Sequence, residues 1–155
     1  MVGLDDKVTK SLNYDQAVKR ILTDINTDFI FAPHFRYIYK NASKFLTYKL
    51  NEELKSGKFN FSLPLTMDIP KSSGLTRPGA ILYPKDRLLY QVLADNMASD
   101  IENNIDRSHV FSNILSNDEN MFEPLGKCFH QFEEAMLDKS EKYEYCIKTD
   151  VTSFF

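Results

Sequence analysis

Cysteine and glycine are scarce in this chain. Its 155 residues include two cysteines and five glycines. Cys128 and Cys146 are too few and too far apart for a disulfide framework or a zinc knuckle, so we expect two buried thiols in a reducing cytoplasm. The glycines form no cluster, which excludes a glycine-rich phosphate loop. The three histidines have no ligand spacing, and no Ser-His-Asp arrangement is evident.

Long apolar runs, repeats and linkers are also missing. No apolar run approaches the roughly 18 residues needed to cross a bilayer. The first residues, Met-Val-Gly-Leu-Asp-Asp, have neither a basic head nor an apolar stretch, so we expect no secretory signal. The sequence therefore predicts one cytoplasmic domain that does not contact a membrane.

The charge is unevenly distributed along a composition typical of soluble globular proteins, with 43% apolar and 26% charged residues. Residues 31–90 hold ten Lys/Arg and four Asp/Glu, whereas residues 91–155 hold five and thirteen. A basic middle before an acidic last third can form a phosphate-tracking surface beside a cation-requiring site. Ordinary solvated helix faces give the same counts.

Helical periodicity dominates the sequence, and it predicts four helices. Asn13 can cap the first helix, and Pro84 suits the first turn of the third. The segment 29–35, which is rich in aromatics, is expected to form a loop around Pro33. The four predicted helices cover about 13–26, 38–57, 84–105 and 128–136.

Alternating apolar residues predict extended structure between and after these helices. Residues 59–71 are expected to form a strand with an irregularity at Pro64. Ser72-Ser-Gly-Leu is turn chemistry, so we predict a β-hairpin over 65–82. A polar, irregular excursion is expected at 106–125 and a terminal strand from residue 143. The predicted class is α+β.

Two places carry candidate chemistry. Lys71 closes one predicted strand and Arg77 opens the next, and two cations across a hairpin can clamp a triphosphate. Cations also flank turns for solubility and to protect sheet edges. At the terminal strand, Asp150 ends a face shared with Glu144 and Cys146. A carboxylate at the tip of a buried strand is costly unless a cation meets it, so Asp150 is a candidate metal ligand.

Three motifs in order resemble the opening half of a reverse transcriptase domain. They are Ile69-Pro-Lys71 followed by Arg77-Pro, then Asp86-Arg-Leu-Leu-Tyr-Gln91, then Lys148-Thr-Asp-Val-Thr-Ser-Phe-Phe. The resemblance covers residues 14–155 and is greatest to the bacterial retron-like, group II intron-like and phage-defence enzymes. It implies helix-rich fingers over 1–142, then the first palm strand of a right-hand polymerase fold at 143–155.

The resemblance assigns roles at the end of the chain. Asp150 matches the first catalytic carboxylate of an RNA-directed DNA polymerase and would hold two Mg²⁺ ions. Val151 would lie beside the triphosphate of the incoming dNTP. Phe155 matches the aromatic that packs under the incoming sugar.

It also assigns roles to three cations and names the partners. Lys71 and Arg77 match the fingers cations that grip the triphosphate. Arg87 is matched more loosely, either to a contact with the template backbone or to a pair within the fold. The implied partners are an RNA template, a DNA or RNA primer and dNTPs.

The chain departs from the family pattern at two places. Family members often carry an arginine soon after the serine of the excursion, where this chain has Ser112-Asn-Ile-Leu. The Tyr-x-Asp-Asp strand pair, which supplies the remaining metal carboxylates, is not in these residues. A single Asp cannot hold two cations tightly, so we expect the 155 residues to be inactive alone, as the N-terminal part of a longer enzyme.

Two alternatives remain open. The first is a defence-associated relative that makes DNA without copying a template. The second is a non-catalytic nucleic-acid-binding module built from the basic region 31–90. The second predicts binding that falls steeply with salt and does not depend on Asp150.

Overall fold

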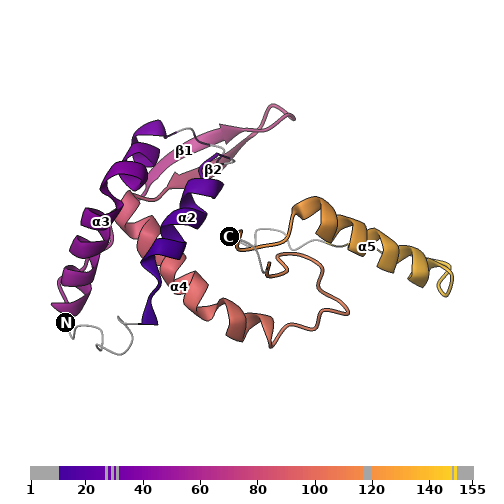
Figure 1. Cartoon of the computed structure of the whole chain (residues 1–155). Coiled ribbons are helices and arrows are strands. Elements are labelled where there is room, and N and C mark those ends of the chain that lie inside the picture. Colours follow the sequence, from indigo (N-terminus) through magenta and orange to yellow (C-terminus); the bar gives the residue numbers. More distant parts are fainter. Residues whose placement is uncertain are drawn as a thin grey trace.

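The computed structural model describes residues 11–26, 28, 30, 32–116, 120–147 and 149. It shows an α+β chain, as predicted, in which four helices accompany a two-stranded antiparallel sheet within these ranges (Figure 1). The elements in chain order are α2 (Tyr14–Asp24), α3 (Pro33–Lys55), β1 (Leu65–Pro70), β2 (Thr76–Ile81), α4 (Pro84–Glu102) and α5 (Leu125–Ser140).

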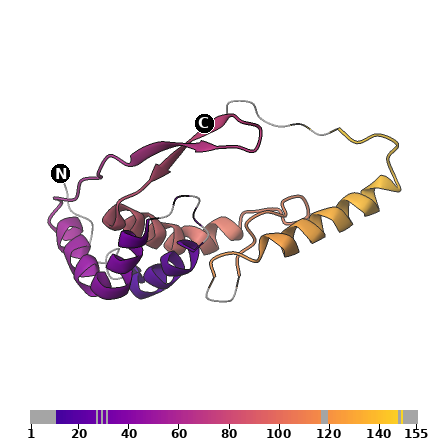
Figure 2. The same ribbon diagram turned by 90° about the horizontal axis from the view of Figure 1, so that it is seen from above.

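The hydrophobic core lies where α2, α3 and α4 pack against one another (Figures 1 and 2). Side chains at helical spacing supply it, among them Ile21, Leu50 and Leu88, which are fully buried. Polar contacts hold the same helices together. The Tyr39 hydroxyl donates to the carbonyl oxygen of Pro84 at 2.9 Å, and burial raises the pKa of Tyr39.

The helix starts follow local chemistry. The Asn13 side chain accepts from the Gln16 N–H at 3.1 Å, so the predicted cap of α2 is confirmed. Pro84 occupies the first turn of α4, also as predicted. The loop expected around Pro33 is wrong from that residue onward, because α3 begins there. Proline at a helix start removes an N–H that would have no partner in the helix, and its fixed φ suits the first turn.

The hairpin is confirmed, but its first strand is shorter than predicted. β1 begins directly after Pro64, and residues 59–64 lie outside any strand. Aromatic packing replaces strand pairing here, since the rings of Phe59 and Phe61 meet edge to face at 4.9 Å between centroids. The helix predicted to about residue 105 ends at Glu102.

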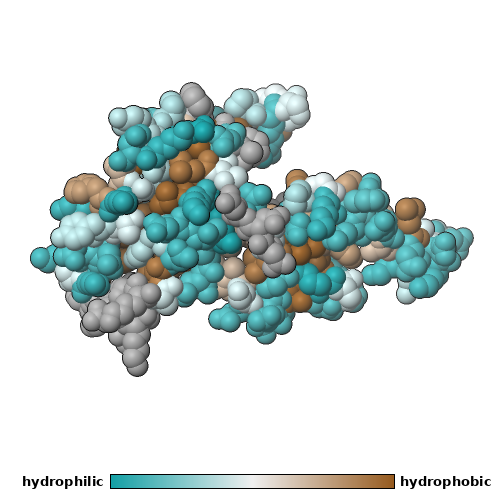
Figure 3. Space-filling model, in the orientation of Figure 1, coloured by the Kyte–Doolittle hydropathy of each residue, from teal (hydrophilic) through white to brown (hydrophobic). Residues whose placement is uncertain are grey.

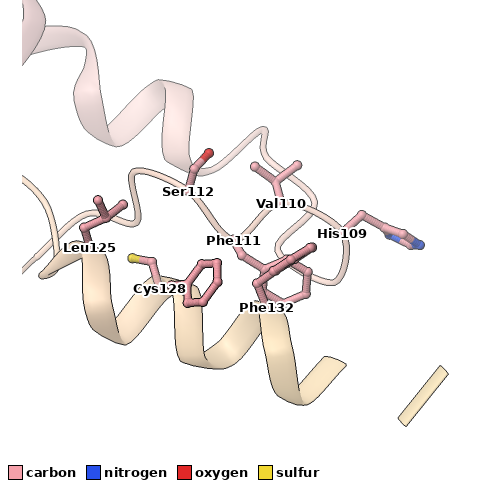
Figure 4. Close-up of a pocket in the computed structure, with 8 residues that line it drawn as sticks. His109, Val110, Phe111, Ser112, Leu125, Cys128 and Phe132 are labelled. Carbon is pink, nitrogen blue, oxygen red and sulfur yellow. The ribbon is translucent and has the colours of Figure 1, made fainter. Parts of the chain in front are cut away.

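α5 extends away from the three-helix core and packs against the excursion that precedes it (Figures 1 and 2). Phe132 of α5 meets Phe111 of the excursion edge to face, with ring centroids 6.0 Å apart. Cys128 is buried at this contact, beside a cavity of about 340 Å³ (Figure 4). The prediction of a buried thiol is confirmed for Cys128 and wrong for Cys146, which is exposed.

The excursion is organised by Arg107, which the sequence did not single out. Its Nε and Nη2 atoms donate to the carboxylate of Glu102, and its Nη1 donates to the carbonyl oxygens of Val110 and Ser112 at 3.2 and 2.9 Å. The hydrogen bond from Arg107 lowers the pKa of Glu102. One planar guanidinium thus fixes a loop that lacks regular structure.

The terminal strand predicted from residue 143 does not form in the described residues. Residues 143–147 lie outside any strand and are exposed. A strand needs a hydrogen-bonding neighbour, and neither β1 nor β2 pairs with this segment. Residue 148 and residues 150–155 lie outside the described part of the chain. Within the described residues, the helices are too short or too polar to cross a membrane.

Candidate functional site

The candidate site is the β1–β2 hairpin, whose register is set by a tight turn. The strands pair antiparallel from Leu65 opposite Ile81 to Pro70 opposite Thr76. Beyond the last pair, the Lys71 N–H donates to the Leu75 carbonyl oxygen at 2.7 Å. Gly74 completes the turn with a φ of 81°, which glycine adopts without strain.

The two predicted cations share one face of this hairpin. Arg77 lies opposite Ile69, and residues 77, 79 and 81 are half-buried while their neighbours 76, 78 and 80 are exposed. Arg77 is therefore on the face that turns toward the helices. Lys71 pairs with Leu75, two positions from the Ile69–Arg77 pair, so the alternation puts Lys71 on the same face, diagonal to Arg77.

A cavity of about 350 Å³ lies between this inner face and the helices, and apolar side chains show beneath the hairpin (Figure 3). Ile69 and Ile81 line it from the sheet, with Asp24 and Asp28 near the end of α2 and Arg87 of α4. Burial raises the pKa of the Asp24 carboxyl, and the nearby Arg87 guanidinium opposes this only in part. Two carboxylates against one guanidinium do not favour an anion inside the cavity.

Arg87 is engaged within the fold. Its Nη1 and Nη2 atoms approach the two carboxylate oxygens of Asp28 at 2.5 and 3.3 Å. This is the second of the two roles that the sequence left open for Arg87, and it ties α4 to the segment after α2. A contact with nucleic acid stays a prediction that would require this pair to open or to be shared.

Asp86 anchors the segment that leads into the hairpin. It is 2% exposed in the first turn of α4, and its Oδ2 accepts from the Ser62 N–H at 3.1 Å. Its neighbour Lys85 pairs with Glu53 of α3 at 2.6 Å. An acid in the first turn of a helix is favourable for the helix dipole, which local sequence can indicate. The link to Ser62 joins residues 24 positions apart, and local sequence does not indicate it.

Gly79 lets Ile69 cross the inner face of the hairpin. A Cβ on Gly79 would lie 2.3 Å from Cδ1 and 2.8 Å from Cγ1 of Ile69. Gly79→Ala is therefore expected to lower the free energy of opening of the hairpin by about 1–3 kcal/mol. The measurement is hydrogen exchange, which should become faster at the amides of β1 and β2.

Two comparisons make that prediction specific. In an Ile69→Ala background the Gly79→Ala cost should largely disappear, because the clashing atoms are gone. Gly126→Ala on α5 meets open space and should leave the hairpin unchanged. Equal exchange rates in Gly79→Ala and the unaltered chain would contradict the packing described here.

Three of the predicted site residues, Asp150, Val151 and Phe155, lie outside the described residues. Inside the described ranges, no three His, Cys, Asp or Glu side chains come together in a way that could hold a metal ion. The register places Lys71 and Arg77 on one face of the hairpin, and Arg87 is in an ion pair, while the magnesium site stays a prediction.

Comparisons with known proteins add no family assignment: no protein-family model, curated protein or solved structure matches the chain.

Proposed function

We propose that this chain is the fingers part of an RNA-directed DNA polymerase, and that Lys71 and Arg77 grip the triphosphate of the incoming dNTP. The observation that carries the proposal is the placement of both cations on one face of a hairpin. The arginine fork can hold two phosphate oxygens at once, and the lysine adds a mobile point charge. The order of motifs along the sequence supports the same assignment.

The turn end of the hairpin suits this role, since neither Lys71 nor Arg77 lines the cavity that holds Asp24 and Asp28. The cations lie at and near the turn, and the segment that leads into the hairpin is tied to α4 through Asp86 and Ser62. A gripping element must hold its charges in a fixed position to stabilise a developing negative charge. The hydrogen bond between Ser62 and Asp86 restrains the segment before the hairpin. Lys71, at the turn, is exposed and therefore accessible to a phosphate.

The remaining roles rest on the resemblance. Asp150 would contribute a carboxylate to two magnesium ions, Val151 would lie by the triphosphate, and Phe155 would pack under the sugar. The chemistry that the ions supply is activation of the primer 3′-hydroxyl and stabilisation of the pyrophosphate leaving group. The template would be RNA and the primer DNA or RNA.

The proposal is tested at the hairpin by primer extension on RNA in the complete polymerase that it implies. Lys71→Gln and Arg77→Gln should each lower kcat/KM for the dNTP by about ten- to a hundredfold, since each removes charged contacts to phosphate. Arg77→Lys should recover only part of this loss, because lysine cannot bind two oxygens in a fork.

Lys139→Gln provides the matched control, because it removes an exposed lysine from α5, far from the hairpin (Figure 1). It should leave kcat/KM unchanged. Unchanged dNTP kinetics in both hairpin variants would reject the gripping role.

A further inference from the structure

The exposed face of α3 carries an unusual combination of side chains. Three aromatic residues point to solvent on it: Tyr37 is 69% exposed, Phe45 is 64% exposed and Tyr48 is 60% exposed. Four lysines, Lys40, Lys44, Lys49 and Lys55, are exposed along the same helix. We call these seven residues the aromatic–lysine face.

Helical spacing places these residues together. α3 is kinked at Ala42, whose φ of −128° and ψ of 15° are not helical, so the spacing holds on each side of that residue separately. After the kink, Lys44, Tyr48 and Lys55 follow one another at steps of four and seven residues, which lie on one side of an α-helix, and before it Tyr37 and Lys40 are three residues apart. Other side chains of α3 are buried in the core: Phe35, Tyr39, Leu50 and Leu54. The aromatic–lysine face therefore points away from α2 and α4.

The lysines of this face are available to a ligand. Within the described residues, none of the four forms an ion pair. Glu53, near the end of the same helix, pairs instead with Lys85 of α4. Glu52 is the acid exposed beside them, so the face keeps a net positive charge. Such a surface attracts a polyanion and releases its counterions.

The aromatics select the kind of polyanion. Lys49 Nζ lies 5.7 Å from the centroid of the Phe45 ring, so cation and ring already form one contact surface. Exposed rings beside phosphate-binding cations are the combination that holds unpaired bases, which stack on the rings while the backbone follows the charges. Paired bases in a duplex do not expose their faces for such stacking.

The same features argue against a membrane surface. A helix that lies in a membrane interface needs its aliphatic side toward the lipid. The aliphatic side of α3 is instead covered by α2 and α4, and Tyr39 fixes it through the hydrogen bond to Pro84.

We propose that the aromatic–lysine face of α3 binds single-stranded nucleic acid. After the kink at Ala42, the stretch from Lys44 to Lys55 extends about 16 Å along the helix axis, long enough for a few nucleotides. α3 lies on the opposite side of the three-helix core from α5, at the outer edge of the molecule (Figure 1). This site is separate from the hairpin cations, and it does not depend on the proposed polymerase activity.

The test is binding of fluorescein-labelled oligo(dT) and oligo(U) to the chain, followed by fluorescence anisotropy across a series of salt concentrations. Replacing the four lysines with glutamine should reduce the magnitude of the log–log salt slope by up to about 3, since each phosphate contact contributes about 0.7. Replacing Tyr37 and Tyr48 with alanine should weaken binding at least about fivefold per residue.

Matched controls remove the same groups elsewhere. Lys19, Lys127, Lys139 and Lys142 are exposed lysines outside α3, and Tyr143 and Tyr145 are exposed tyrosines. Glutamine at these four lysines, or alanine at these two tyrosines, should preserve most of the affinity. Circular dichroism of each variant shows whether the helices persist.

Three results would overturn the proposal. They are no binding by the unaltered chain at 50 mM salt, equal losses in the α3 and control variants, or α3-dependent binding to phosphatidylserine vesicles without binding to oligonucleotides. Failure of the hairpin variants in primer extension would bear on the polymerase alone, because Lys71→Gln and Arg77→Gln should not abolish this binding.

Discussion

Leu88→Ala is expected to destabilise the chain by about 2–5 kcal/mol. Leu88 is 0% exposed and lies in the core shared by α2, α3 and α4. Truncation removes buried methyl groups and leaves a cavity that three packed helices can fill only in part. Because a domain is stabilised by only about 5–15 kcal/mol in total, urea unfolding followed by circular dichroism should show a much lower midpoint.

Leu93 provides the matched control on the same helix. It is 37% exposed, so Leu93→Ala should cost about 1 kcal/mol or less. Both variants remove the same atoms and have the same helix propensity change, which leaves burial as the difference between them. Equal costs for the two variants would show that the three helices do not form a common core.

Asp150→Asn is expected to abolish primer extension on an RNA template in the complete polymerase that the proposal implies. The amide has the shape of the carboxylate but not its charge, and hard cations such as Mg²⁺ are held by charged oxygens. The expected loss is several orders of magnitude in kcat, with folding unchanged. The measurement is a primer-extension assay with Mg²⁺ and dNTPs.

Asp138→Asn is the control for Asp150→Asn. Asp138 is an exposed acid on α5 that lies 3.6 Å from Lys142, so its replacement should leave extension intact. Full activity of Asp150→Asn would refute the catalytic assignment, whatever the hairpin variants show. Extension that continues without any template would instead favour the untemplated alternative.

Local sequence determined most of the secondary structure. Asn13 and Pro84 were sufficient to place the starts of α2 and α4, because a cap and a proline at the first turn act within a few residues. Ser72-Ser-Gly-Leu between two extended runs was sufficient to place the hairpin, whereas its register, with Arg77 opposite Ile69, came from the structure. The motif order also pointed to a polymerase, which stays a proposal.

Only the tertiary structure decided which polar side chains are used inside the fold. Arg87 meets Asp28, Asp86 meets Ser62, and Arg107 collects the carbonyl groups of the excursion. The contacts of Arg87 and Asp86 join residues far apart in the chain, so no periodicity or spacing in the sequence predicts them. The sequence does not distinguish a charged side chain that is solvated from one that is paired inside the fold. Because an unpaired charge is costly to bury, the tertiary structure determines which charged side chains need a partner.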